Sequence, residues 1–204
     1  MFPAVLWRPG PARLVLLVIG LWIFGTGESL LVASRLGNSP WVVLSEGVER
    51  HSPLSVGTAT IVVSVLVLLL WIPLRQAPGL GTVLNAIIIG LAIAVMLPLL
   101  PSHPEAGLAW PLMAGGIVLV AVGGGIYLGT RLGPGPRDGL MTGLHAKTGR
   151  SLRLVRTCIE VTVMAAGFAL GGKVGVGTVA FALLIGPSVQ WAFGRAWPLM
   201  QQLR

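Results

Sequence analysis

Three charged residues lie well inside long apolar stretches of the 204-residue chain. Glu28 falls in the stretch that starts near residue 12, and Arg156 and Glu160 fall one helical turn apart in a later one. An isolated charge at the centre of a bilayer costs at least about 2.5 to 3.5 kcal/mol on insertion scales. We therefore expect these side chains to face the interior of a helix bundle, where they could bind a solute or a proton.

Arg156 and Glu160 have two interpretations. At positions i and i+4 of one helix they can pair with each other, and the pair either locks helices together or belongs to a solute or proton site. Glu28 has no neighbouring cation in the sequence, which makes it the better candidate for a functional carboxylate. Asn85, in a third apolar stretch, is either a further polar group of the same site or a residue that hydrogen-bonds between helices.

Further candidates lie at expected helix ends. Two copies of a Gly-x-Gly-Thr motif end at Thr82 and Thr178. Threonine can cap free backbone N–H groups, and a helix N-terminus carries partial positive charge. The motifs predict either two anion-facing helix ends or, as we favour, tight turns with close helix packing. Arg137 and Asp138 follow a proline and predict either a gate or anion contact, or a local salt bridge that ends the loop.

The sequence contains no recognisable catalytic or metal-binding set. His51, His103 and His145 fall in predicted loops without metal-ligand spacing, and no serine, histidine and acid set is evident. We expect neither an enzyme nor a bound cofactor. The single Cys158 excludes an intrachain disulfide framework. The net charge of +8 does not predict nucleic-acid binding, because no basic run is interleaved with aromatic residues.

The composition is that of a membrane protein. Hydrophobic residues make up 54% of the chain and charged residues 10%, whereas soluble domains carry about 25% charged residues. A membrane-spanning helix needs about 20 residues, so the chain has room for little besides such helices. We predict a single all-α membrane domain, residues 1–204, with six transmembrane helices at 12–34, 55–74, 79–101, 108–131, 151–172 and 175–197.

An internal repeat with an offset of 96 residues organises these helices. Over residues 12–90, 20 of 79 positions are identical to the position 96 residues later, and seven of twelve are identical between 79–90 and 175–186. We predict two three-helix repeats, 12–101 and 108–197. Because three crossings are an odd number, the second repeat must start on the opposite side of the membrane. Inverted-topology repeats of this kind build many secondary transporters.

Each predicted repeat has a break after its first helix. A glycine is followed by a proline three residues later in both copies, at Gly37 and Pro40 and at Gly133 and Pro136. Glycine commonly ends a helix and proline commonly begins one. The stretches 41–49 and 138–145 mix apolar and polar residues and predict short interfacial or partly re-entrant helices. Broken backbone at membrane depth is tolerated only inside protein or along a cavity.

The distribution of basic residues predicts the orientation. Three of the fourteen, Arg35, Arg50 and Lys173, fall on one side of the predicted topology. The other eleven fall on the side of both termini, which we therefore predict to be cytoplasmic. Some of them should also contact lipid headgroups. The eleven are Arg8, Arg13, Arg75, Arg131, Arg137, Lys147, Arg150, Arg153, Arg156, Arg195 and Arg204.

Taken together, several of these motifs resemble the YczE/YyaS/YitT group of bacterial integral membrane proteins. The resemblance covers nearly the whole chain and implies a bacterial inner-membrane location. Members of that group are largely uncharacterised and are described only as candidate transport proteins, so the resemblance assigns no site residues. It is carried by Leu36-Gly37-x-x-Pro40-Trp41, the Gly-x-Gly-Thr pair, Gly133-Pro-Gly-Pro136-Arg137-Asp138, Arg156-x-x-x-Glu160, and Gly171-Gly172-x-x-Gly175-x-Gly-Thr178 with Gly186-Pro187-Ser188.

The leading hypothesis is a small-solute transporter with a site at the interface of the repeats. Glu28, Asn85, Arg156 and Glu160 would line the site, and an anionic or zwitterionic solute is preferred. The alternative is a non-transporting membrane partner or regulator. The glycine-rich faces 114–116 and 123–125 suit helix association, with another protein or in a homo-oligomer. A membrane-embedded enzyme is a third and weaker alternative.

Overall fold

All regular secondary structure in the described residues is helical, as predicted. The computed structural model describes Trp7 and residues 9–201, with side chains as far as Arg195. Arg8 and Arg204, which contribute to the predicted charge bias, lie outside the described residues.

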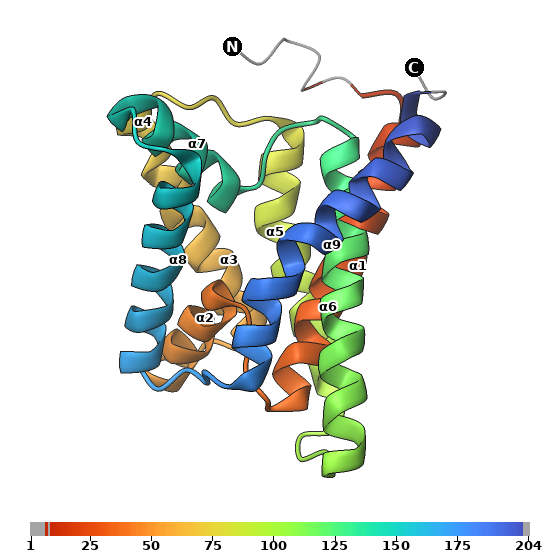
Figure 1. Ribbon diagram of the computed structural model, residues 1–204, viewed down its shortest axis with the longest axis vertical. Helices are drawn as coiled ribbons and strands as arrows, with labels where there is room; N and C mark the ends of the chain where they lie inside the picture. Colours follow the sequence, from red (N-terminus) through yellow and green to blue (C-terminus); the bar gives the residue numbers. More distant parts are fainter. Residues whose placement is uncertain (1–6, 8, 202–204) are drawn as a thin grey trace.

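Six long helices correspond to the six predicted segments (Figure 1). The second segment is broken at Leu70 and continues as the short α4 (Trp71–Leu74), and the third ends in a 3₁₀ turn at Leu97–Leu99. Two shorter helices, α2 (Pro40–Arg50) and α7 (Pro136–Thr148), occupy the stretches predicted as interfacial or re-entrant. The long helices are α1 (Pro11–Ser34), α3 (Val56–Leu69), α5 (Leu80–Met96), α6 (Ala106–Gly129), α8 (Leu152–Ala169) and α9 (Val176–Gln201).

Five helical segments of the described chain are long and apolar enough to cross a membrane. They are α1, α3 together with α4, α5 through Leu99, α6, and α9 through Arg195. The predicted fifth span, α8, is not among them. It has 18 residues and carries three charges, Arg153, Arg156 and Glu160. The structure therefore supports five of the six predicted spans by length and composition.

Positions 96 residues apart adopt the same backbone conformation at the breaks. Arg35 and Arg131 end α1 and the turn after α6 with φ of 59° and 51°, and Gly37 and Gly133 follow with φ of 119° and 122°. A φ near 120° is accessible in practice only to glycine. The two glycines are thus required by the turn that redirects the chain into α2 and α7.

Each break is held by the third helix of the other repeat. The N–H of Gly81 in α5 donates to the carbonyl of Leu132 at 2.8 Å, and the N–H of Gly177 in α9 donates to the carbonyl of Leu36 at 2.8 Å. Both bonds use free N–H groups in the first turn of a helix. The two contacts are related by the same offset, since 81 and 177, and 36 and 132, each differ by 96.

The most extensive helix packing in the described chain is that of α1 on α6, which run in opposite directions (Figure 1). A methyl group placed on Gly123 would lie 2.5 Å from the carbonyl oxygen of Gly20, and one placed on Gly116 would lie 2.8 Å from that of Gly27. Small residues therefore let the two backbones touch. Much of the glycine-rich faces considered for partner association thus contacts helices within this chain, since Gly125 also packs against α9, while Ala114 stays exposed.

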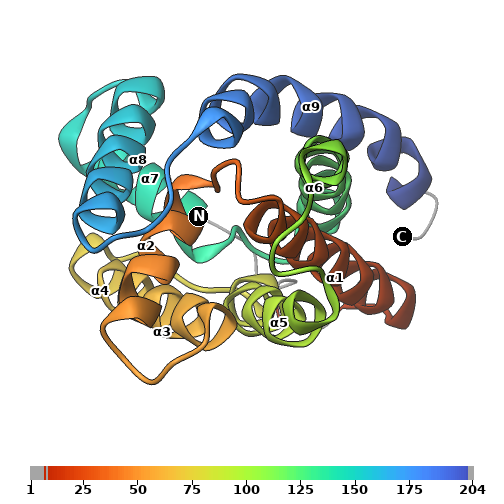
Figure 2. The same ribbon diagram turned by 90° about the horizontal axis from the view of Figure 1, so that it is seen from below.

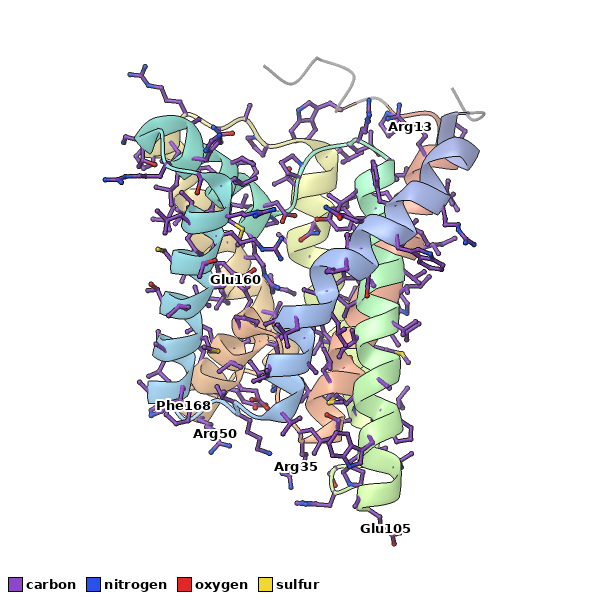
Figure 3. All side chains as sticks on the ribbon, viewed as in Figure 1. Arg13, Arg35, Arg50, Glu105, Glu160 and Phe168 are labelled. Carbon is purple, nitrogen blue, oxygen red and sulfur yellow. The ribbon has the colours of Figure 1, made fainter. Side chains whose placement is uncertain are left out.

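Three of the basic residues that carry the predicted charge bias lie at the two ends of the bundle. Figure 3 places Arg13 at one end of the molecule and Arg35, Arg50 and Glu105 at the other. The start of α1 and the end of α9 lie at the same end as Arg13 (Figure 1). Seen along the bundle, the break before α2 lies near the middle and α2 lies between α3 and α8 (Figure 2).

Candidate solute-binding cavity

A cavity of about 250 Å³ lies between the helices of the two halves. Side chains from α1, α2 and α5 to α9 line it, together with Ser39 and Gly135 immediately before α2 and α7. All four residues predicted to bind a solute reach its wall, namely Glu28, Asn85, Arg156 and Glu160. The fold thus brings together polar residues that are up to 132 positions apart, from 28 to 160.

Glu28 is the most deeply buried charged residue of the cavity. Its side chain is 0% exposed, and the hydroxyl of Ser39 lies 2.9 Å from both of its carboxylate oxygens. Ser39 occupies this position because the break after Gly37 turns the chain back toward α1. Glu28 forms no ion pair within the described residues, where the one ion pair joins Arg156 and Glu160. Arg137 is its main electrostatic partner.

Arg137 and Asp138, in the first turn of α7, face the same cavity but do not pair with each other. The Arg137 guanidinium lies 5.2 Å from the centre of the Trp41 ring, in a cation–π contact. The hydroxyl of Tyr127 donates to Asp138 Oδ2 at 2.6 Å. Among the described residues no ion pair joins the two, and each side chain has a partner on another helix.

Arg156 and Glu160 form the predicted i, i+4 ion pair, with Nε and Oε1 2.9 Å apart. The two side chains are 50% and 29% exposed, so the pair borders the open side of the cavity rather than its floor. A pair this exposed contributes at most about 1 kcal/mol to stability. Its charges are therefore available to a ligand at low cost.

Asn85 approaches the cavity from α5. A methyl group placed on Gly135, just before α7, would lie 3.0 Å from its Nδ2, so the amide sits against the beginning of α7. The lining there is formed by glycine, which leaves the amide accessible from the cavity.

Thr82 and Thr178 are not part of the cavity wall as the structure describes it. Thr82 accepts from the N–H of Gly79 at 3.1 Å and donates to the carbonyl of Pro134 at 2.7 Å. Thr178 accepts from the N–H of Gly175 at 3.3 Å. Both threonines thus cap the first turn of their own helix and contact the helix break of the other half. The geometry therefore agrees with the tight-turn interpretation and gives no support to anion-facing helix ends at these residues.

Sequence reasoning did not single out Ser39, Trp41 or Tyr127 as site residues. Ser39 could have been found as the residue before Pro40, where a helix start needs a polar side chain. Trp41 could have been found because it is the position equivalent to Arg137 in the 96-residue repeat. Tyr127 carries no such signal except that it is the single tyrosine of the chain.

The cavity wall combines three acidic and two basic side chains. Glu28, Asp138 and Glu160 supply the carboxylates, and Arg137 and Arg156 the guanidinium groups. Among the described residues, no group of three or more His, Cys, Asp or Glu side chains could hold a metal ion. What the arrangement offers chemically is recognition of a small solute that carries charge.

Comparison with known proteins gives a family and relatives without an assigned activity. Residues 11–193 match the model of DUF6198, described as a family of unknown function. An uncharacterized protein of Haemophilus influenzae is 39% identical over 188 residues, covering 91% of this chain and 85% of the relative. Two proteins of Bacillus subtilis are similar as well: the uncharacterized membrane protein YczE is 32% identical (89% of this chain, 85% of the relative), and the uncharacterized protein YyaS is 29% identical (79% and 82%).

No solved structure matches the chain. The resemblance to YczE and YyaS is confirmed by these relatives. Together with five helices of membrane-spanning length and composition, they identify a multi-pass membrane protein.

Proposed function

Since the chain belongs to the DUF6198 family, whose function is unknown, we propose its function from the cavity itself: transport of a small zwitterionic solute across the bacterial cytoplasmic membrane. The observation that carries the proposal is a cavity of mixed charge inside the helix bundle, in which Glu28 and Arg137 form no ion pair with each other or with a third residue described here. Charges held in this way inside a membrane protein mark solute or ion pathways.

The charges favour a zwitterion over a simple anion. Three carboxylates face two guanidinium groups, so a purely anionic solute would add a repulsive charge to the cavity. A solute carboxylate could pair with the planar Arg137 guanidinium, which suits bidentate contacts. A solute ammonium could donate to Glu28 beside Ser39. The volume of about 250 Å³ lies just below the range of drug-sized pockets, about 300 to 1,000 Å³, and suits a solute of amino-acid size.

The arrangement of the halves supports the same proposal. Matched helices run in opposite directions in Figure 1, as α1 and α6, α3 and α8, and α5 and α9 do. The reciprocal contacts at Gly81 and Gly177 have the relation expected of a two-fold axis in the membrane plane. We propose that the chain consists of two inverted-topology repeats, 12–101 and 108–197, with α8 as the sixth transmembrane helix and both termini in the cytoplasm. Secondary transporters place their substrate site at such an interface.

The proposal is tested by flux measurements on the purified protein in lipid vesicles, with a panel of small zwitterionic, anionic and cationic solutes. We expect uptake of at least one zwitterion. Glu28→Gln and Arg137→Lys should each reduce it by about tenfold or more, because the first removes a charge and the second removes one of two bidentate hydrogen bonds, and a hydrogen bond to a charged group contributes about 1.5 to 3 kcal/mol. The matched control is Glu105→Gln, an exposed carboxylate at the end of the bundle.

Two outcomes would contradict the proposal. One is no flux of any solute in the panel by protein that unfolds cooperatively. The other is flux that survives both cavity substitutions unchanged. We place the enzyme and the non-transporting partner behind transport. The glycine faces suited to a partner are already in contact with this chain's own helices.

A further inference from the structure

The two halves of the molecule differ most in how the second and third long helices of each half pack. In the first half α3 lies against α5. In the second half the matching α8 packs on α2 and α7 and makes at most slight contact with α9 over the part of the chain that the structure describes. Figure 2 shows the same difference, with α3 beside α5 and the segment after α8 crossing over to reach α9.

The contact between α3 and α5 is a close one, built on two glycines. A methyl group placed on Gly57 would lie 2.5 Å from the carbonyl oxygen of Gly90, and one placed on Gly90 would lie 2.4 Å from Cγ1 of Ile61. The polar residues on the inner side of α3, Thr60 and Ser64, are 1% and 6% exposed. We call the interface between α3 and α5 the seam of the first half; it is closed by these contacts.

The corresponding seam in the second half is open. Gly186 matches Gly90, yet a methyl group placed on Gly186 would meet no atom within 4 Å. Arg156 and Glu160 match Thr60 and Ser64, and they are 50% and 29% exposed rather than buried. Ile61 packs on Gly90 in the first half, whereas no side chain that the structure describes packs on the matching Gly186. Arg156 and Glu160 line the same cavity as Gly186.

The contacts that hold α8 away from α9 lie at its other end. A methyl group placed on Gly167 would lie 2.5 Å from the backbone nitrogen of Leu44 in α2. In the first half the residue that matches Gly167 is Trp71, which reaches α7 instead: its indole donates to the carbonyl of Pro136 at 2.9 Å. α8 is therefore anchored to α2, and α3 with its continuation α4 is anchored to α7, so that each contacts the short helix of the opposite half.

The frame around the open seam is the same in both halves. The crossing of α1 and α6 uses the reciprocal contacts of Gly20 with Gly123 and of Gly27 with Gly116. Backbone in direct contact cannot slide without steric overlap. The crossing of α1 and α6 is thus common to both halves, whereas α3 and α8 differ in how they pack against the third long helix of their own half.

We propose that the protein has a second conformation in which α8 closes against α9 at Gly186 while α3 leaves α5 at Gly90, so that the cavity exchanges one opening for the other. The inference rests on the proposed transport function, for which it supplies alternating access. Alternating access requires two arrangements of similar free energy. Here these are the packing of α3 on α5 and the packing of α8 on α9, around the same crossing of α1 and α6. The conformation described here would be the state open between α8 and α9.

Closure in the second half would centre on Thr157 and Gly186, the positions that match Ile61 and Gly90. Arg153 stands where the first half has Gly57, so the seam cannot close as tightly at that turn. Arg153 lies at the beginning of α8, where a long side chain can extend toward the headgroups. Closing would also bury the Arg156–Glu160 pair, which is exposed at membrane depth in the open state.

Disulfide cross-linking in native membranes tests the inference without any solute. Thr157→Cys with Gly186→Cys, in a Cys158→Ala background, reports closure of the second half. Ile61→Cys with Gly90→Cys in the same background reports closure of the first. We expect both pairs to cross-link on oxidation, because oxidation traps even a state populated at about 0.1 to 10%. Prior cross-linking of 61 to 90 should slow the 157–186 bond, measured with a variant that carries all four cysteines and a staged oxidation.

The native Cys158 provides the matched control. It stands one residue beyond Thr157 and matches Val62, which is 40% exposed and directed away from the seam. Gly186→Cys with Cys158 retained should therefore not cross-link. The inference is overturned if 157 and 186 fail to cross-link while 61 and 90 do, if Cys158 reacts as readily as residue 157, or if locking 61 to 90 leaves the other bond unchanged. Since none of these readouts involves flux, a molecule that transports nothing could still pass, and a transporter could still fail.

Discussion

The break before α2 brings the hydroxyl of Ser39 to the buried carboxylate of Glu28 in the cavity. Ser39 lies in the extended residue before Pro40, where its hydroxyl faces Glu28 instead of capping α2. A serine at a helix start normally accepts from a free backbone N–H. Here it donates to a carboxylate that is 0% exposed. Ser39 therefore does not cap α2 and instead forms a hydrogen bond with the carboxylate of Glu28.

Ser39→Ala should destabilise the protein through Glu28. The substitution removes the hydrogen-bond donor of a buried carboxylate, which costs about 1 to 3 kcal/mol. The measurement is thermal unfolding of the purified protein in detergent. In a Glu28→Gln background the same change should cost less, and equal costs in the two backgrounds would contradict the direct role of the hydroxyl.

A second buried carboxylate, Glu46 in α2, predicts a dependence on pH. Burial raises its pKa above 4.5, and the backbone N–H and charge of Lys173 only partly oppose the rise, while Glu49 adds to it. The folded protein therefore holds this proton more tightly than the unfolded chain, so Glu46 lowers stability as the pH rises from 4.5 through the folded pKa. We expect the unfolding temperature to fall over that range.

Glu46→Gln should flatten this pH dependence and leave stability at neutral pH unchanged or higher. The amide keeps an acceptor for the N–H of Lys173, which donates to Glu46 Oε2 at 2.8 Å. Unfolding scans of both proteins at several pH values test the expectation. An unchanged slope in the variant would show that another group titrates.

The cavity residues that could be predicted are those whose placement in an apolar membrane helix costs free energy. Glu28, Arg156 and Glu160 stand out because charge in an apolar segment needs a reason, and Asn85 for a weaker version of the same reason. Trp41 and Tyr127 were not predictable, because aromatic residues in membrane helices most often serve packing or the interface. Only the fold reveals that Tyr127 donates to Asp138.

At the scale of helices, hydrophobicity and turn residues predicted most of the architecture. All six long helices and both short ones lie where glycine, proline and apolar runs placed them. The break at Leu70 was not predicted, because no glycine precedes it and Pro73 lies within the following helical turn. The open seam between α8 and α9 was also beyond the sequence, since the repeat alone predicts identical packing in both halves.

The crossing of α1 and α6 predicts which glycines tolerate a side chain. Gly123→Ala would place a methyl group 2.5 Å from backbone atoms of Gly20 and Phe24, and we expect a loss of about 1 to 3 kcal/mol from overpacking. Gly115→Ala, on the same helix, would meet only the end of Leu30 at 3.7 Å and should be neutral or slightly stabilising.

Thermal unfolding of both alanine variants in detergent provides the comparison. Equal stabilities would show that α1 and α6 can separate at their crossing without cost. That result would also remove the rigid frame on which the exchange of seams depends.

The whole molecule predicts a division of accessible sites between the two membrane faces. In a Cys158→Ala background, Lys147→Cys near the end of α7 should react with an impermeant maleimide only after the cells are opened. Ser102→Cys, in the connection between α5 and α6, should react in intact cells. The physical reason is the excess of Lys and Arg at the α7 end. Labelling of residue 147 from outside would reverse the orientation.

The Trp41–Arg137 contact joins two positions with the same place in the repeat, since 41 and 137 differ by 96. Under the two-fold relation that we propose for the halves, side chains that meet their own counterparts lie on the axis, where a symmetric molecule would have to stack tryptophan on tryptophan or set arginine against arginine. One of each gives the site a polarity that the backbone lacks. Trp41→Arg combined with Arg137→Trp would keep one cation over one indole and move one positive charge of the cavity from α7 to α2, while Glu28, Asp138, Arg156 and Glu160 stay in place.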